Sequence, residues 1–116
     1  MTMIAQWMLS AALALAPLCA QQADADRALA EQRAQIDTID ARLVELLNER
    51  ARVVQRIGAI KKSAGRSVSD SRREAAVLRN ARERSRGPLP NDSIERILQV
   101  ILIEMSDLQR REQGID

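Results

Sequence analysis

The sequence predicts an all-α protein built from three helices, one long, one short and one of medium length. Apolar residues recur at spacings of three and four along three stretches of the chain, which is the pattern of amphipathic helices. Gly, Pro and Ser gather in the two segments between these stretches and indicate turns. The alternating pattern of a β-strand occurs nowhere in the sequence.

Residues 1–20 are interpreted as a signal peptide. They contain no Asp, Glu, Lys or Arg, and their apolar run from Met8 to Ala20 is too short for a membrane-spanning helix. We expect cleavage near residues 20–25, where small residues are frequent, and a mature protein that is periplasmic or secreted without stable membrane association. The alternatives are an uncleaved apolar arm or a start codon assigned too far upstream. The single cysteine, Cys19, falls in this segment, so the mature chain has no disulfide.

The first predicted helix runs from Asp24 to Lys62. This stretch has no Pro and a single Gly, and roughly 35 helical residues extend about 50 Å. A helix of this length has no core of its own, so its apolar stripe must pack on other helices, including those of a second chain. The stripe contains Ile36, Ile39, Leu43, Leu46, Leu47, Val53, Val54, Ile57 and Ile60.

A turn centred on Gly65 separates this helix from a shorter one at about Asp70–Arg84. The linker at residues 85–92, with one Gly and two Pro, precedes a third helix. We expect the third helix to begin with Asp92 as its N-cap, with Glu95 completing a capping box. Its pattern ends after Gln109, and residues 113–116 are predicted to be a frayed tail.

The composition excludes several function classes. The only aromatic residue, Trp7, lies in the signal segment, so base stacking on single-stranded nucleic acid is excluded. The net charge is +2 with interspersed signs, which does not suggest a duplex-binding surface. The mature chain has no His and no Cys, and no metal site is predicted. So small a domain without aromatic residues is marginal alone, and dimerisation would stabilise it.

Three cations interrupt the apolar stripe of the first helix: Arg33, Arg50 and Lys61. Burying an unpaired cation is costly, so each needs a counter-charge or an anionic ligand. For one such residue, a snorkelling stem or an internal salt bridge suffices. Three cations in one stripe instead favour a small dianionic ligand.

The spacing of these cations indicates a site shared between two chains. Arg50 and Lys61 are roughly 16 Å apart along a helix, a gap that two side chains and a ligand can fill. Arg33 and Arg50 are roughly 25 Å apart, too far to hold one small molecule. Arg33 would therefore come from the other subunit of a two-fold dimer with two equal sites.

The second and third helices add further polar residues to this region. Asp70, Arg73 and Glu74 return over Lys61 after the turn, and Gln109 ends the apolar face of the third helix with an amide donor. Asp70 as an N-cap and Glu74 in a capping box with Ser71 are the simpler alternatives for the two carboxylates. Those roles leave Lys61 and Arg73 unexplained.

From about residue 26 to residue 112 the chain resembles the all-helical, AroQ-class chorismate mutases. The resemblance implies an intertwined helical homodimer that rearranges chorismate to prephenate, for the synthesis of Phe and Tyr, without a cofactor. The residues that carry it are Arg33 in "EQRAQIDTID", Arg50 in "LLNERARVV", Lys61 in "RIGAIKKS", Asp70, Arg73 and Glu74 in "SDSRREAAVL", and Gln109 in "EMSDLQ".

The resemblance also implies a role for each of these residues. Arg33 of one chain and Arg50 of the other bind the substrate carboxylates with help from Arg73. Lys61 and Gln109 donate to the ether oxygen, and Asp70 and Glu74 serve the hydroxyl side of the ring. A pericyclic reaction of this kind needs no nucleophile or general base, only a held conformation and stabilised charge. One departure from the family pattern is Met105 in place of a Ser, with Ser106 one position later.

Two other functions compete with this interpretation. Isochorismate pyruvate lyase shares the fold and much of the cation set, but that branch does not usually carry the Arg73-Glu74 pair. A non-enzymatic helical adaptor would use the three cations in interchain salt bridges to Asp40 and Glu45, and would not respond to a dianionic ligand.

Overall fold

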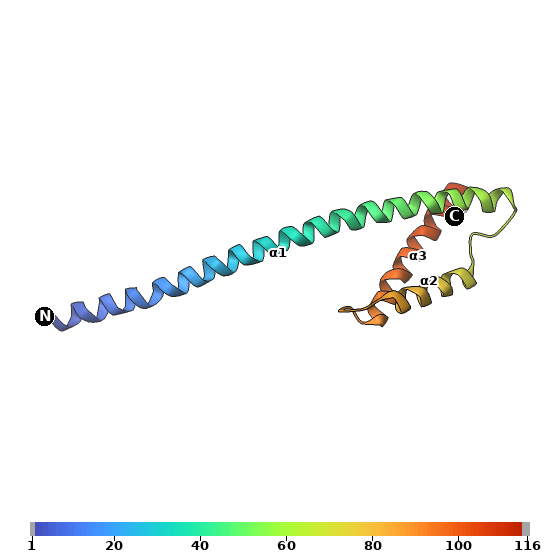
Figure 1. Ribbon diagram of the computed structural model, residues 1–116. Helices are drawn as coiled ribbons and strands as arrows, with labels where there is room; N and C mark the ends of the chain where they lie inside the picture. The colour runs from blue at the N-terminus through green and yellow to red at the C-terminus, as the bar shows by residue number, and fades with distance from the viewer. Residues whose placement is uncertain (1, 115–116) are drawn as a thin grey trace. The chain divides into compact units, whose positions relative to one another are not determined.

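The computed structural model describes residues 2–114, with side chains from residue 17 onward. Three helices occur in this range and no strand: α1 (Thr2–Ser63), α2 (Ser71–Arg84) and α3 (Asn91–Gln113) (Figure 1). The all-α class and the order of long, short and medium helices are therefore confirmed. Of the predicted frayed tail, Ile115 and Asp116 lie outside the described residues.

The long helix begins earlier than predicted. α1 continues through the segment interpreted as a signal peptide, Pro17 included, because Ala, Leu and Met are good helix formers. No helix in residues 2–114 combines the length and the apolar character that crossing a membrane requires. Export and cleavage remain predictions.

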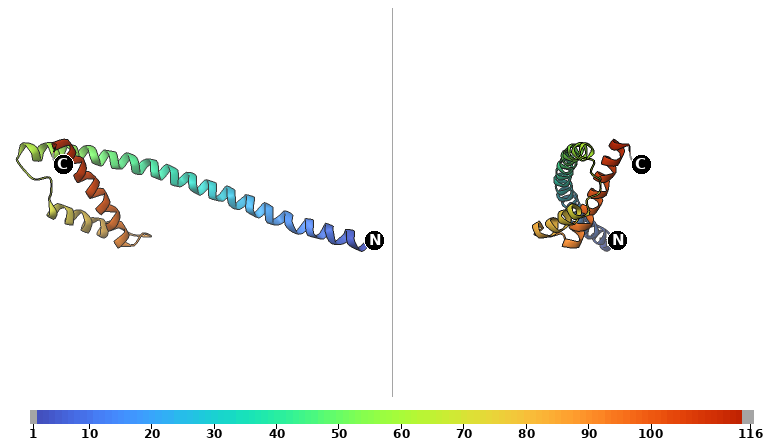
Figure 2. Two further views of the ribbon diagram at one scale, coloured as in Figure 1. Left: turned by 180° about the vertical axis from the view of Figure 1, so that it is seen from behind. Right: turned by 90° about the vertical axis from the view of Figure 1, so that its right-hand side faces the viewer.

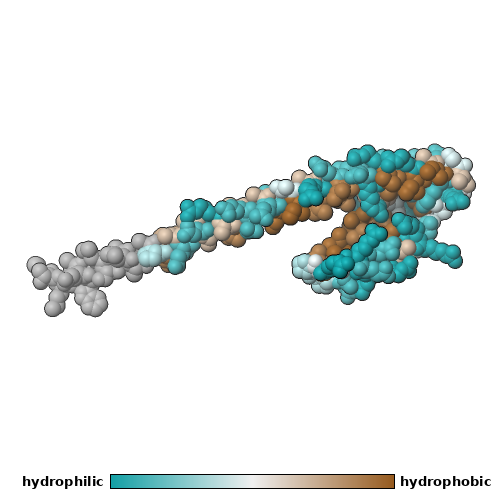
Figure 3. All heavy atoms as spheres, in the orientation of Figure 1, coloured by the Kyte–Doolittle hydropathy of each residue, from teal (hydrophilic) through white to brown (hydrophobic). Residues whose placement is uncertain are grey.

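The chain divides into two units, residues 1–45 and 46–116. The first unit is the N-terminal part of α1, a single helix without a core. Apolar surface is exposed along this helix (Figure 3), because its large apolar side chains meet no partner within the unit. Those exposed side chains include Leu18, Leu29, Ile36, Ile39, Leu43 and Val44.

The second unit combines the end of α1 with α2 and α3 (Figures 1 and 2). α2 packs directly on α3. α1 instead reaches α3 through long side chains, of which the Gln109 amide, donating to the Val54 carbonyl at 3.2 Å, is one. Among the described side chains, Val54 (8% exposed) and Gln109 (7% exposed) are the buried ones, so a polar side chain is as buried as any apolar one.

The turn between α1 and α2 forms where the sequence places it. Gly65 adopts a left-handed conformation with φ +65°, which a side chain would strain, and the Arg66 amide donates to the Lys61 carbonyl at 2.8 Å. Asp70 caps α2, its carboxylate accepting the Arg73 backbone N–H at 3.0 Å. The N-cap role, the simpler alternative for Asp70, is therefore observed.

The predicted capping box of the third helix is wrong. Pro90 precedes α3, and its carbonyl accepts from the Ser93 and Ile94 amides without any side-chain cap. Asp92 and Glu95 instead bind the Arg82 guanidinium, at 2.6 and 2.7 Å. The cause is tertiary: Arg82, near the end of α2, takes both carboxylates. Its hydrogen bonds raise the pKa of Arg82 and lower the pKa of Asp92.

α3 also ends later than predicted. The helix continues past Gln109 to Gln113 and closes on Gly114 in the left-handed conformation, with φ +70°. A glycine at this position satisfies the last carbonyls of a helix without strain. The final turn is further held to α1, because Gln55 donates to Glu112 and Gln113 donates to the Gly58 carbonyl.

Candidate active site

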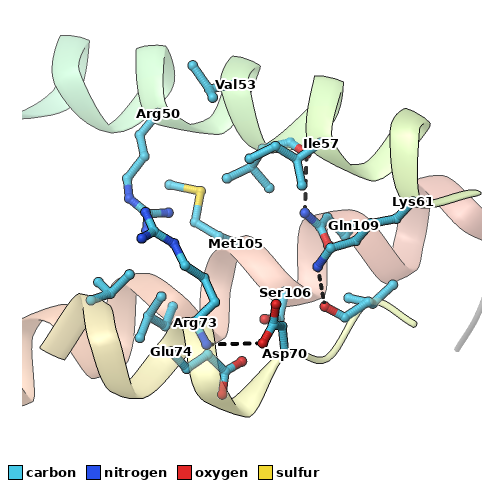
Figure 4. A pocket seen from close by; sticks show the side chains of 14 residues that line it. Arg50, Val53, Ile57, Lys61, Asp70, Arg73, Glu74, Met105, Ser106 and Gln109 are labelled. Atoms are coloured by element: carbon cyan, nitrogen blue, oxygen red, sulfur yellow. Dashed lines mark hydrogen bonds between the residues drawn. The ribbon is translucent and has the colours of Figure 1, made fainter. Parts of the chain in front are cut away.

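A cavity of about 240 Å³ lies within the second unit, between α1, α2, α3 and the α1–α2 turn (Figure 4). Six of the seven predicted site residues line it. Arg33, the seventh, is exposed on the first unit and is not among the lining residues. The six are Arg50, Lys61, Asp70, Arg73, Glu74 and Gln109.

The remaining wall of the cavity is largely apolar. Val54 and Ile57 of α1 face Leu102 and Met105 of α3, which gives a ligand a dry surface beside the charged groups. Ser106 also lines the cavity (Figure 4). α3 therefore offers a hydroxyl to this space even though Met105 stands one position earlier.

Two arginines form one end of the cavity. Arg50 extends from α1 and Arg73 from α2, and their side chains point toward one another (Figure 4). Among the described residues, neither makes an ion pair with a carboxylate. Burial, followed by the charge of Arg73, lowers the pKa of Arg50, although a guanidinium stays charged in proteins. This end is therefore an uncompensated positive site.

A lysine and a glutamine form the other end (Figure 4). The Lys61 ammonium donates to the Val68 carbonyl in the turn at 2.9 Å, and the Gln109 amide donates to the Val54 carbonyl at 3.2 Å. An ammonium has three N–H groups and an amide nitrogen has two, so each retains a donor for a ligand. Both donors are fixed in place by backbone carbonyls before any ligand arrives.

The two carboxylates of the cavity come from the first turn of α2. Asp70 is engaged as the N-cap. Because Asp70 and not Ser71 caps the helix, the alternative capping box between Ser71 and Glu74 does not form, and Glu74 faces the cavity. Three cations against two carboxylates leave a formal charge of +1, which favours an anion.

The donor set of the cavity suits anion binding and the stabilisation of negative charge on oxygen. Guanidinium groups bind carboxylates in a bidentate manner, and ammonium and amide groups donate to a single oxygen. Across the part of the chain that the structure describes, no group of three or more His, Cys, Asp or Glu is arranged to hold a metal ion. The cavity has no thiol or imidazole among its lining residues.

Comparison with known proteins identifies the family. A family profile described as chorismate mutase type II matches residues 32–110. The chain belongs to the chorismate mutase type II family. The match reaches into all three helices of the second unit and includes every residue that lines the cavity.

Individual relatives agree with this family. The bifunctional chorismate mutase/prephenate dehydratase of Neisseria gonorrhoeae is 39% identical over 85 residues, which cover 73% of this chain and 23% of that protein. Its counterpart in Aquifex aeolicus is 33% identical over 87 residues, which cover 72% of this chain and 24% of that protein. The chain thus spans about a quarter of the length of these curated relatives.

A solved structure matches the fold. The chorismate mutase (form II) of Thermus thermophilus superimposes with a TM-score of 0.70 at 29% identity, covering 72% of this chain and 94% of that chain. The all-helical fold of this family, expected from the resemblance, is confirmed.

Sequence reasoning missed the backbone groups of the site. The carbonyls of Val68 and Val54 anchor Lys61 and Gln109, but a carbonyl is present at every residue and leaves no signal in the sequence. Gln113 was also missed. Its signal is spacing, because Gln113 follows Gln109 by one helical turn and so lies on the same face of α3.

Proposed function

We propose that this chain is a chorismate mutase, which isomerises chorismate to prephenate for the synthesis of Phe and Tyr. The observation that carries the proposal is the division of the cavity into an uncompensated pair, Arg50 and Arg73, and an anchored pair of donors, Lys61 and Gln109. A substrate with two carboxylates and one ether oxygen fits this division. The family and the names of the relatives support the same reaction.

The arginines bind and orient the substrate. In the reaction the ether C–O bond breaks while a C–C bond forms between the enolpyruvyl methylene and the ring, so no group leaves and no proton is transferred. The ring must hold its side chain in the diaxial conformation, and fixing both carboxylates imposes that geometry. Arg50 takes one carboxylate, and Arg73 beside it reinforces the positive charge.

Lys61 and Gln109 stabilise the transition state. As the ether bond breaks, its oxygen gains negative charge, and donors already aimed at it bind the transition state more strongly than the substrate. Both side chains are held by carbonyls of the protein, so little reorganisation is needed during the reaction. Asp70 and Glu74 serve the hydroxyl side of the ring.

The proposal includes a homodimer in which Arg33 of one chain completes the site of the other. Support comes from the exposed apolar stripe of the first unit, which needs a packing partner, and from charge. The cavity carries +1 from its own chain, and one more arginine would bring it to +2, the charge that a dianion neutralises.

Activity is tested by incubating the purified protein with chorismate and following the loss of chorismate absorbance and the appearance of prephenate. Incubation with isochorismate, analysed for salicylate and pyruvate, tests the lyase alternative in parallel. Conversion of chorismate alone supports the proposal. If chorismate is unchanged by the refolded, helical protein, the proposed function is wrong.

The shared site is tested by mixing two inactive variants, Arg33→Ala and Arg50→Ala, after unfolding and refolding together. If each site takes one arginine from each chain, half of the dimers are mixed and one of their two sites is intact. About a quarter of the unaltered activity should return. A mixture as inactive as its components would show that Arg33 and Arg50 act within one chain, and an active Arg33→Ala protein would show that Arg33 has no role.

We also propose that the protein is exported and acts in the periplasm or outside the cell. The uncharged apolar segment at residues 1–20 supports this localisation. Expression in a Gram-negative host, followed by mass measurement of the protein in the periplasmic fraction, tests it. Release of a chain that begins between residues 20 and 26 is the expected result, and an unprocessed chain in the cytoplasm would contradict it.

A further inference from the structure

Two hydrogen bonds from side-chain amides of α3 to backbone carbonyls of α1 join the two helices beside the cavity. The Gln109 amide donates to the Val54 carbonyl at 3.2 Å, and the Gln113 amide donates to the Gly58 carbonyl at 3.3 Å. Val54 and Gly58 are one turn apart on α1, as Gln109 and Gln113 are on α3. The two hydrogen bonds therefore repeat the same contact one turn further along both helices.

The Gln109 side chain is buried, yet open space adjoins it in two places. A second cavity of about 160 Å³ lies behind it, lined by Gly58, Lys62 and Gln113 among others, and Gln109 lines both cavities. The Gln109 side chain borders both cavities, and its stem lies beside Gly58 of α1. Its position consequently depends on its hydrogen bond and on the distance between α1 and α3.

α3 is held by its packing on α2 and by the Gln55–Glu112 hydrogen bond, and the two amide–carbonyl hydrogen bonds, one turn apart, set how the last turn of α3 lies along α1. The Gly58 carbonyl can accept the Gln113 amide in addition to its own helical hydrogen bond, because a carbonyl oxygen has two lone pairs. Gln113 is outside the cavity with Arg50 and Lys61, so it does not touch a ligand there.

We propose that Gln113 is a positioning residue that acts through Gln109. By holding the last turn of α3 on the Gly58 carbonyl, it keeps the Gln109 amide on the Val54 carbonyl with its second N–H available to the substrate. This inference rests on the proposed mutase function for its kinetic part, and on the structure alone for the order of the Gln109 side chain.

The kinetic test compares Gln113→Met with Gln99→Met. Methionine keeps the length and helix preference of glutamine but cannot donate, and Gln99 is an exposed glutamine on the same helix. Gln113→Met should lower kcat about tenfold with KM changed less than about twofold, because a small displacement of a transition-state donor costs rate rather than binding. Gln99→Met should match the unaltered protein. Unchanged kcat in a folded Gln113→Met protein overturns the proposal.

A double-mutant comparison separates positioning from general destabilisation. In a Gln109→Ala background, Gln113→Met should have no further effect on kcat, because the group through which it acts is missing. An equal loss in both backgrounds would show that Gln113 only supports the fold, and would overturn the proposal. If Gln113→Met does not fold, Gln113→Ala is judged by the same two comparisons.

An NMR measurement keeps this inference separable from the proposed function. In the unaltered protein the side-chain amide of Gln109 should be ordered on the ps–ns timescale, and in Gln113→Met it should become mobile. If the unaltered protein leaves chorismate unchanged, the proposed function fails while this result still decides the role of Gln113. A Gln109 amide that is equally ordered in both proteins overturns the positioning role, whatever the activity.

Discussion

The two ends of the cavity differ in how their polar groups are held. Arg50 and Arg73 face one another without a carboxylate partner. Burial and the charge of Arg73 disfavour the charged form of Arg50 and lower its pKa. Lys61 and Gln109 are each tied to a backbone carbonyl. A group that binds the substrate can remain unpaired until the substrate arrives, whereas a group that stabilises the transition state works best when fixed beforehand. Substitutions at each end of the cavity, and at two positions outside the cavity, test this difference.

The largest effect is expected at the anchored end. Lys61→Ala removes the ammonium proposed to donate to the ether oxygen, and should lower kcat at least about a hundredfold while the helical structure remains. Steady-state kinetics and far-UV circular dichroism measure both. Lys62→Ala, in which the neighbouring ammonium is removed, is the matched control. Near-normal turnover of Lys61→Ala would exclude Lys61 from the mechanism.

The arginine end should respond mainly in KM. A hydrogen bond to a charged group is worth about 1.5–3 kcal/mol, so Arg50→Met should raise KM roughly 10- to 100-fold and lower kcat much less. Without substrate, its thermal midpoint should equal or exceed that of the unaltered protein, because a partly buried charge and its repulsion from Arg73 disappear. Arg52→Met, at an exposed position, is the control. A fall in kcat at constant KM in Arg50→Met would show that the arginine end acts on the transition state as the lysine end does, and would contradict this comparison.

A smaller effect is expected in the α1 wall behind Gln109. A Cβ added at Gly58 would meet the Gln109 Cγ at 3.5 Å, an ordinary contact, so Gly58→Ala fits and should stabilise α1 by about 1 kcal/mol. Gly58→Leu would displace the Gln109 stem and lose that gain. Chemical denaturation of both variants measures the difference. Equal stability of the two would mean that Gln109 is not packed on α1 as described.

The smallest effect concerns Arg82, a half-buried arginine that has carboxylate partners, unlike Arg50. Arg82→Met should lower the thermal midpoint slightly at neutral pH. Because Arg82 lowers the pKa of Asp92, the stabilisation is present above the ordinary value of 3.8 and is lost as pH falls through the lowered pKa. Thermal scans from pH 7 to pH 2 should therefore show the two proteins converging. A difference independent of pH would assign the effect to the Arg82 stem.

The sequence predicts the three helices and most of the candidate site because both depend on local spacing. Stripes at three and four residues, the Gly65 turn and the Asp70 cap follow from neighbours within one or two turns. The start of α3 does not follow from local spacing, because Asp92 pairs with Arg82 of α2 instead of capping α3. The anchors of Lys61 and Gln109 are carbonyls, which no residue type reveals. The role of Arg33 stays a prediction, because it depends on a second chain.

The near absence of a core has a consequence for how the protein behaves in solution. Among the described side chains, Val54 is the one apolar side chain that is buried, while others, such as Val77, Leu78, Leu98 and Leu102, are half-buried, so an isolated chain has limited hydrophobic free energy to oppose its conformational entropy. Folding would then be coupled to association, and the midpoint of unfolding would rise with protomer concentration. Dilution alone, without heat or denaturant, would then dissociate and unfold the proposed homodimer.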